Sequence, residues 1–133
     1  MSKYVFPAVF TPEGKLYAVD FPDIPNCYTQ GEGLNDALEM ANDVLCLTFY
    51  HMEKEGKTIP SPSDIHDLKI NDPHSFVSLI GCDTFEYQKF YEKKSIKKTL
   101  TIPQWLNTAA EQNHINFSAV LQAALIEKLG LSQ

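Results

Sequence analysis

The stretch SIKKTLTIPQWLNTAAEQNHINFSAVLQAALIEKLGLSQ, residues 95–133, decides how this chain is organised. It predicts an alternating strand at Lys97–Ile102 and a first helix over Pro103–Asn113, with the proline at the first helical position. A second helix is predicted over Asn116–Leu129, with Asn116 as its N-cap. A strand without a partner in its own segment is only marginally stable in water. We therefore expect this strand to pair with the same strand of a second copy, which forms a two-fold ribbon.

Side chains alternate along that strand, so its two faces differ in chemistry. Leu100 and Ile102 face one way together with Lys98, whose stem can pack there. Two-stranded ribbons are one way to enter the major groove of DNA, and a helix N-terminus binds phosphate through its backbone N–H groups. The alternative for the strand is that it merely has an ordinary polar face. The alternative for the start of the second helix is ordinary helix capping. The candidate DNA-binding residues are Lys97, Thr99, Thr101, Asn116, Phe117 and Ser118.

Residues 95–133, here called the tail, are too few to bury a stable core alone. The first helix buries Leu106, Ala109 and Ala110, with Trp105 as a flanking anchor. The tail therefore predicts a homodimer. The apolar stripe of the second helix is Phe117, Val120, Leu121, Ala124, Leu125 and Leu129.

Charge divides unevenly between the tail and the preceding residues 1–94, here called the body. The body holds 15 acids and 8 lysines, which gives −7, and the tail holds 2 acids and 3 lysines, which gives +1; the sum is the overall −6. All 11 basic residues are lysines, so bidentate guanidinium recognition of bases is excluded. An acidic body is a poor non-specific binder of nucleic acid.

The three cysteines, Cys27, Cys46 and Cys82, form no Cys-x-x-Cys pair and are interpreted as unpaired thiols of a reducing compartment. Cys46 and Cys82 lie in apolar runs typical of a core. The sequence contains neither a signal peptide nor an apolar run long enough to span a membrane. We expect a cytoplasmic protein.

The body predicts a β-β-β-α-β order with a short final helix, an α+β unit. Pro7 indicates an edge position or a bulge in the first strand, and the apolar run at Ser75–Cys82 predicts a central strand. Phe85, Phe90 and Tyr91 are expected to anchor the final helix. The predicted elements are strands at Lys3–Thr11, Leu16–Phe21 and Cys27–Gln30, a helix at Leu34–Lys54, a loop at Thr58–Asp72, a strand at Ser75–Cys82 and a helix at Thr84–Tyr91.

The tail resembles a ribbon-helix-helix DNA-binding module, through its strand, the Pro103 start and the Asn116-x-Ser118 turn. The body resembles the HicB antitoxin family, through residues 17–27 (YAVDFPDIPNC), Thr29-x-Gly31 and the apolar positions that follow Asp36. Asn26 departs from the family's usual glycine, although asparagine tolerates a positive φ.

The resemblance implies a partial ribonuclease-H-like body at residues 1–92 and a dimerising ribbon-helix-helix module at 93–133. It further implies an antitoxin of a type II toxin–antitoxin system that inhibits a HicA-type mRNA-cleaving toxin and represses its own operon. The partners would be the toxin, operator DNA and a second copy, with a higher assembly in the presence of toxin. The toxin-facing candidates are Asp20, Phe21, Asp23, Ile24 and Tyr28, with local packing as the alternative for each.

Other classes of function are less well supported by the sequence. A nuclease needs converging carboxylates, but the first strand contains none and Asp20, Asp23 and Asp83 lie at strand ends or in turns. No histidine pairs with a cysteine at the spacing of metal ligands. We therefore expect neither an enzyme nor a cofactor. A remaining alternative is a dimeric transcriptional regulator that senses a small ligand between the sheet and the helix at residues 34–54.

Overall fold

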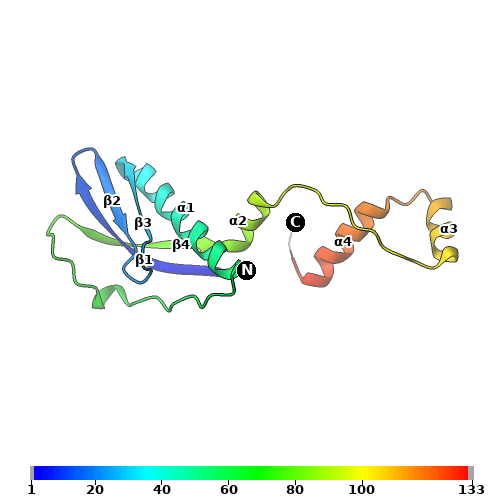
Figure 1. Cartoon of the computed structure of the whole chain (residues 1–133). Helices are drawn as coiled ribbons and strands as arrows, with labels where there is room; N and C mark the ends of the chain where they lie inside the picture. Colours follow the sequence, from blue (N-terminus) through cyan, green and yellow to red (C-terminus); the bar gives the residue numbers. More distant parts are fainter. Residues whose placement is uncertain (1, 132–133) are drawn as a thin grey trace. The chain divides into compact units, whose positions relative to one another are not determined.

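The computed structural model describes residues 2–131, and the chain divides into two compact units between Lys94 and Ser95, two residues after the predicted boundary. The first unit is the body and the second is the tail (Figure 1). In chain order, the elements are β1 (Lys3–Glu13), β2 (Leu16–Asp20), β3 (Tyr28–Glu32), α1 (Gly33–Lys54), the 3-10 turn η1 (Ile65–Asp67), β4 (Phe76–Asp83), α2 (Thr84–Tyr91), α3 (Gln104–Gln112) and α4 (Phe117–Leu129).

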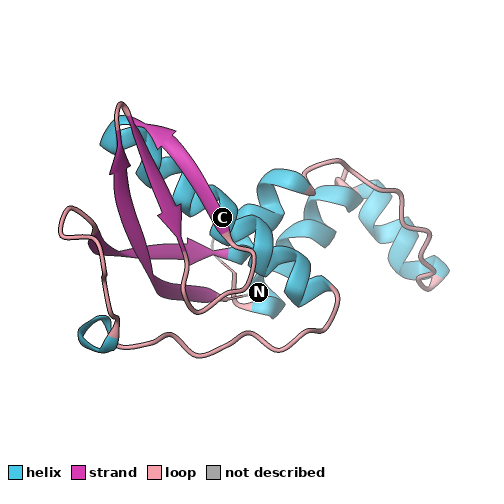
Figure 2. Ribbon diagram, turned by 60° about the vertical axis from the view of Figure 1, so that its left-hand side comes forward, coloured by secondary structure: helices cyan, strands magenta, loops and turns pink. Residues whose placement is uncertain are grey.

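The body is one antiparallel sheet with a helix on one face. The strand order is β3-β2-β1-β4, and every neighbouring pair is antiparallel. Helix α1 lies along one face of this sheet, and a long irregular segment leads from its end back to β4 (Figures 1 and 2). The predicted α+β class and the β-β-β-α-β order are confirmed.

The core lies between α1 and the sheet because alternate residues of each strand point toward the helix. Phe6, Ala8 and Phe10 of β1 are buried there. The Phe49 ring of α1 meets the rings of Tyr4 and Phe6 edge-on, each at 4.9 Å between centroids. Aromatic side chains therefore fill the space in which a ligand-sensing regulator would need its pocket.

Close approach of α1 to β3 requires a glycine at position 31. A Cβ built on Gly31 would lie 2.4 Å from both the backbone nitrogen and the Cα of Ala37. Because those are backbone atoms of α1, the helix itself would have to move. The glycine therefore sets the distance at which α1 packs on the sheet.

Strand β4 lies at the edge of the sheet, so the prediction of a central strand was wrong. Apolar side chains on both faces of β4 make up its apolar run. Ile80 and Cys82 point into the core, and Phe76 stacks on Phe10 at 5.2 Å. Leu79 points to the opposite face and is 55% exposed. A continuous apolar run therefore does not distinguish a strand covered on both faces from an edge strand with one uncovered apolar face.

The short helix α2 has the predicted bounds but not the predicted anchors. Phe90 and Tyr91 are exposed, whereas Tyr87 packs against the core and Thr84 is buried. The Asp83 side chain caps the helix by accepting from the backbone N–H groups of Phe85 and Glu86. This cap fixes where the first turn starts, and it therefore places Tyr87 on the side of the helix that faces the core. The spacing of the aromatic residues alone did not reveal this orientation.

The prediction that Asn26 tolerates a positive φ is confirmed. Asn26 adopts φ +60° in the turn before β3, the conformation that its replacement of glycine requires. Gly130 adopts φ +68° and ends α4. The N-cap of α4 is Asn116, as expected, while Pro103 is the N-cap of α3 rather than its first helical residue.

In the tail, residues 95–103 form no strand, because no other segment of residues 2–131 pairs with them. The two predicted helices are present, and their apolar side chains remain largely exposed in the single chain, including Leu106, Val120 and Leu125. Trp105, the expected flanking anchor, is also exposed. Within residues 2–131, none of the helices is both long and apolar enough to cross a membrane.

Candidate functional site

The body carries a groove on the sheet face that lies opposite α1. This face presents Val9, Thr11, Ala18 and Asp20, and the loop at residues 69–72 runs beside it. The groove encloses about 600 Å³. Its lining comes from β1, β2, β3 and the loop, and consists of Val9, Thr11, Ala18, Val19, Asp20, Pro22, Tyr28, Thr29, Gln30, Lys69, Ile70, Asn71, Asp72 and Ser75.

Asp20 and Tyr28 come together in this groove because they are register partners on neighbouring strands. The Asp20 side chain is exposed, and Tyr28 is 68% exposed. An exposed tyrosine beside a carboxylate offers both a large apolar contact and polar groups to a partner protein. Two of the five toxin-facing candidates thus lie side by side at the surface.

The other three candidates are occupied within the body. Phe21 and Ile24 are only 1% and 4% exposed and belong to the core, so their assignment to a partner-facing surface was wrong. The Asp23 carboxylate accepts from the backbone N–H of Ser63 at 2.9 Å and from the Ser63 hydroxyl. Asp23 therefore holds the long loop that follows α1.

Gln30 and Lys69 also line the groove, and the sequence prediction missed them. Gln30 could have been found from strand register, because it pairs with Ala18, two residues before Asp20. Lys69 lies in an irregular loop whose path the residue pattern does not define.

The tail carries an apolar cavity of about 560 Å³, which the strand segment and both helices line. Lys98, Leu100 and Ile102 face it, as the alternation predicted, whereas Lys97, Thr99 and Thr101 are exposed and lie outside its lining. The full lining is Lys98, Leu100, Ile102, Leu106, Asn107, Ala110, Ile115, Phe117, Ser118, Val120, Leu121 and Ala124.

The start of α4 lies at the rim of that cavity. The Asn116 side chain accepts from the backbone N–H of Ala119 at 3.1 Å, so it acts as a helix cap. Phe117 and Ser118 are among the residues that line the cavity, and both are exposed in the single chain. The six DNA-binding candidates therefore fall into two groups, which are three exposed residues of the segment before α3 and the capped start of α4.

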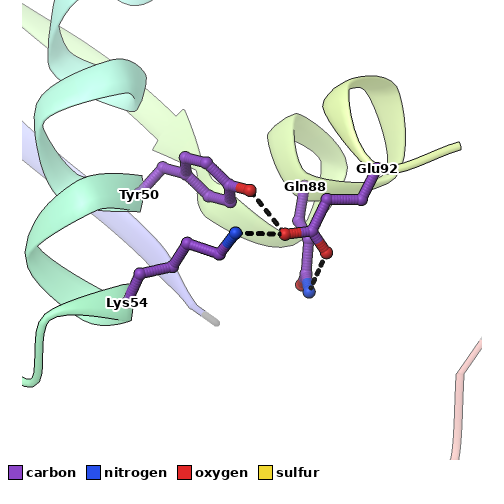
Figure 3. Close-up of polar contacts among 4 residues, drawn as sticks. All are labelled: Tyr50, Lys54, Gln88 and Glu92. Atoms are coloured by element: carbon purple, nitrogen blue, oxygen red, sulfur yellow. Dashed lines mark hydrogen bonds and ion pairs between the residues drawn. The ribbon is translucent and has the colours of Figure 1, made fainter.

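A polar cluster joins the two helices of the body (Figure 3). Glu92, which follows α2, accepts from Tyr50 and pairs with Lys54 at the end of α1. Gln88 donates to the other carboxylate oxygen at 2.9 Å. Lys54, then Tyr50, then Gln88 hold the pKa of the Glu92 carboxyl at about 2, well below its usual 4.5. The contacts of Lys54 with Glu92 and then with Tyr50 raise the pKa of Lys54.

The thiols and carboxylates do not assemble a reactive centre. All three cysteines are buried and unpaired, and burial is the main cause that raises the pKa of Cys27. The hydrogen bond to Cys46, followed by burial, raises the pKa of Cys82. Among residues 2–131, no group of three or more His, Cys, Asp or Glu side chains is placed to hold a metal ion.

Comparison with known proteins relates both units to one family. Residues 6–125 match the family described as HicB-like antitoxin of bacterial toxin–antitoxin systems. The antitoxin HicB of Escherichia coli K12 is 40% identical over 79 residues, which are 56% of this chain and 56% of that protein. The antitoxin HicB 1 of Photorhabdus laumondii is 36% identical over 76 residues. The match thus spans only about half the length of these curated relatives.

Solved structures are similar over nearly the whole chain. A chain of the toxin–antitoxin complex from Streptococcus pneumoniae is 31% identical, with 95% of this chain and 99% of that chain covered and a TM-score of 0.62. The crystal structure of the antitoxin HicB3 is 25% identical, covers 98% of this chain and 100% of that chain, and has a TM-score of 0.52. With a match from residue 6 to residue 125 across body and tail, this chain belongs to the HicB-like antitoxin family of bacterial toxin–antitoxin systems.

Proposed function

We propose that this protein is the antitoxin of a type II system, that its body binds and inhibits a HicA-type toxin, and that its tail dimerises and represses the operon by binding DNA. In this proposal the protein acts in the cytoplasm and has no enzymatic activity of its own. The observation that carries it is the similarity across both units to a chain of a toxin–antitoxin complex.

The toxin-binding surface that we propose is the groove around Asp20 and Tyr28. The exposed tyrosine supplies an anchor, and the body's net charge of −7 suits a basic, RNA-binding partner. Gln30 and Lys69 extend the polar rim of the same groove. Phe21, Asp23 and Ile24 would shape this surface only from within the body.

The DNA-binding surface that we propose is the ribbon formed when two tails pair through residues 97–102. Pairing would cover the apolar cavity and leave Lys97, Thr99 and Thr101 of both chains on the outer face. The backbone N–H groups at Asn116–Ser118 would then meet a phosphate. Without arginine, each ribbon binds weakly, so the two-fold symmetry supplies much of the affinity.

Growth rescue tests the antitoxin half of the proposal. The toxin to use is the short basic protein expected from the neighbouring reading frame. Tyr28→Ala should lose rescue and weaken the complex with toxin, whereas Tyr91→Ala, which truncates an exposed tyrosine on α2, should rescue as well as the unaltered chain. Equal rescue by both variants would show that the groove is not the toxin-binding surface.

A gel shift with the upstream DNA tests the repressor half. Changing Lys97, Thr99 and Thr101 together to alanine should abolish the specific shift while the protein remains dimeric. Lys128→Ala, in the last turn of α4, removes one positive charge elsewhere in the tail and should retain the shift. Specific binding by the triple variant would contradict the ribbon assignment.

A further inference from the structure

Two of the three cysteines meet where α1 packs against β4. The Asn42 side chain of α1 donates to the carbonyl of Gly81 at 2.5 Å and accepts from the thiol of Cys46 at 3.9 Å. Cys46 lies one helical turn after Asn42, and Cys82 directly follows Gly81, so this contact brings the two thiols opposite each other. They share a hydrogen bond, in which the Cys82 thiol donates to the Cys46 sulfur.

The surroundings of Cys46 favour its thiolate form. The hydrogen bond from Cys82 is the main cause that lowers the pKa of Cys46, and the backbone N–H of Asp83 adds a second hydrogen bond to the same sulfur. Burial and the carboxylates of Asp43 and Asp83 oppose these two contacts. The pKa of Cys82 shifts upward instead, because its thiol is the donor. A nucleophilic sulfur thus lies in contact with a protonated thiol, which is the combination that yields a disulfide on oxidation.

The third cysteine, Cys27, has a different environment. Its thiol lies against the Thr48 hydroxyl at 3.7 Å, and burial raises its pKa. Cys46 and Cys82 form no catalytic centre with a carboxylate, but they hold each other in contact. They are 4% and 5% exposed, which leaves the pair open to small molecules at its edge. Disulfides that form in a reducing compartment are commonly transient and respond to oxidants.

We propose that Cys46 and Cys82 are a redox-sensitive pair, which hydrogen peroxide converts to a disulfide between α1 and β4. The Cys46 thiolate attacks one peroxide oxygen, the O–O bond breaks, and a sulfenic acid forms as hydroxide leaves. The proton that Cys46 gave up converts this hydroxide to water. The Cys82 sulfur then attacks the Cys46 sulfur, and its proton leaves with the displaced hydroxide as a second water. Two thiols are oxidised to one disulfide, and one peroxide is reduced to two waters.

The disulfide acts on the stability of the body. It joins residues 36 positions apart and closes a loop that contains the whole irregular segment between α1 and β4. Closing a long loop restricts the unfolded chain, which favours the folded state. Thiols in hydrogen-bond contact need only a small movement to reach the S–S bond length of about 2 Å. The groove lies on the opposite face of the sheet from α1, so the cross-link leaves it open.

Alkylation of the full chain under denaturing conditions, followed by mass spectrometry, tests the pairing. The reduced protein should take up an alkyl group on each of its three cysteines, and the peroxide-treated protein on Cys27 alone. Cys27→Ala is the matched control and should lose both remaining alkylation sites on oxidation, whereas Cys46→Ala should keep both of its sites. Three reactive thiols after peroxide, a disulfide between two chains, or a cross-link in Cys46→Ala overturns the proposal.

A protease cut within residues 57–75 gives a test that needs no variant. This cut separates Cys46 from Cys82 in the chain, so the two fragments of the oxidised protein should migrate as one band on a denaturing gel until reductant is added. Fragments that separate without reductant overturn the pairing. Urea unfolding, followed through the tyrosine signal, measures the consequence: the midpoint should rise by about 1–2 M on oxidation and return on reduction. An unchanged midpoint contradicts the stabilising role.

Discussion

Tyr50 donates its hydroxyl proton to Oε1 of Glu92 across 2.5 Å, and Nζ of Lys54 lies 2.7 Å from the same oxygen. These contacts tie the last turns of α1 to the residue that follows α2. The Tyr50 side chain is buried, so its hydroxyl depends on this partner for its hydrogen bond. Glu92 therefore fixes the end of the body at the point where the chain leaves for the tail.

The first prediction concerns the pH dependence of this cluster. The folded-state pKa of Glu92 is about 2 and the usual value is 4.5, so its stabilising contribution is complete above pH 4.5 and is lost as the pH falls toward 2. Glu92→Gln should therefore lower the melting temperature near neutral pH, and the difference from the unaltered protein should shrink through that acidic range. Glu86→Gln, whose lysine partner lies within α2 itself, should show a smaller difference. A Glu92→Gln effect that stays constant through this range would contradict the assignment.

The second prediction concerns the close approach of α1 to β3. Gly31→Ala should destabilise the body by about 1–3 kcal/mol or more, because the new Cβ meets backbone atoms at Ala37. Gly81→Ala meets nothing within 4 Å and should change the free energy of unfolding by about 0.5 kcal/mol at most. Urea unfolding followed through the tyrosine signal of the body is the measurement. The single tryptophan, Trp105, lies in the tail and serves as an internal control that should not respond. Equal costs for the two variants would refute the close contact.

The third prediction concerns the aromatic core. Phe49→Ala removes a fully buried ring that contacts Tyr4 and Phe6, and should cost about 3–5 kcal/mol of the body's free energy of unfolding. Leu47→Ala, two residues earlier on the exposed side of α1, should cost about 0.5 kcal/mol. Urea titration of both variants gives the comparison, and a small loss for Phe49→Ala would mean that the core repacks.

The fourth prediction concerns tail dimerisation. Burying one leucine contributes about 1.5–3 kcal/mol, and a two-fold interface contains Leu125 twice. Leu125→Glu should therefore weaken tail pairing by roughly a hundredfold or more in dissociation constant. Gln122→Glu adds the same carboxylate at an exposed polar position of α4, outside its apolar stripe, and should leave the pairing nearly unchanged. Concentration-dependent emission of Trp105 reports on the tail alone, and an unchanged Leu125→Glu variant would argue against dimerisation through α4.

The fifth prediction separates the two acids near the groove. Asp23→Ala should release the loop after α1, lower stability by about 1–2 kcal/mol and speed proteolysis within residues 57–75, because Ser63 loses its acceptor. Asp20→Ala removes an exposed carboxylate and should leave stability unchanged while it weakens toxin binding. Limited proteolysis and a binding titration on both variants test this prediction. A loss of stability in Asp20→Ala together with weaker toxin binding in Asp23→Ala would contradict the proposed surface.

Local chemistry explains which parts of the fold could be predicted. The helix α1, the short helix α2 and the two tail helices were predictable because apolar spacing, caps and a terminal glycine act within a few residues of each other. The positive φ of Asn26 was predictable for the same reason. Sequence resemblance also placed the chain in its family before any contact was known.

The candidate site was predicted only in part. Asp20 and Tyr28 were both predicted and lie together in the groove, but the register that pairs them was not visible from either residue. Phe21 and Ile24 follow Asp20 within four residues, yet they point into the core. These sequence neighbours differ in exposure because the turn after β2 folds back on the body. The hydrogen bond from the Phe21 N–H to the Cys27 carbonyl closes this turn.

The amino-acid sequence was sufficient to establish the α+β class, the division into an acidic body and a separate two-helix tail, and the alternation that sets Leu100 and Ile102 against Lys97, Thr99 and Thr101. These properties depend on composition and on periodicity within single elements. Only the tertiary structure decided that β4 lies at the sheet edge, that Asp23 holds a loop, and that Glu92 joins α1 to α2. Those outcomes depend on long-range strand order and packing, which bring together residues such as Tyr50 and Glu92, 42 positions apart in the chain.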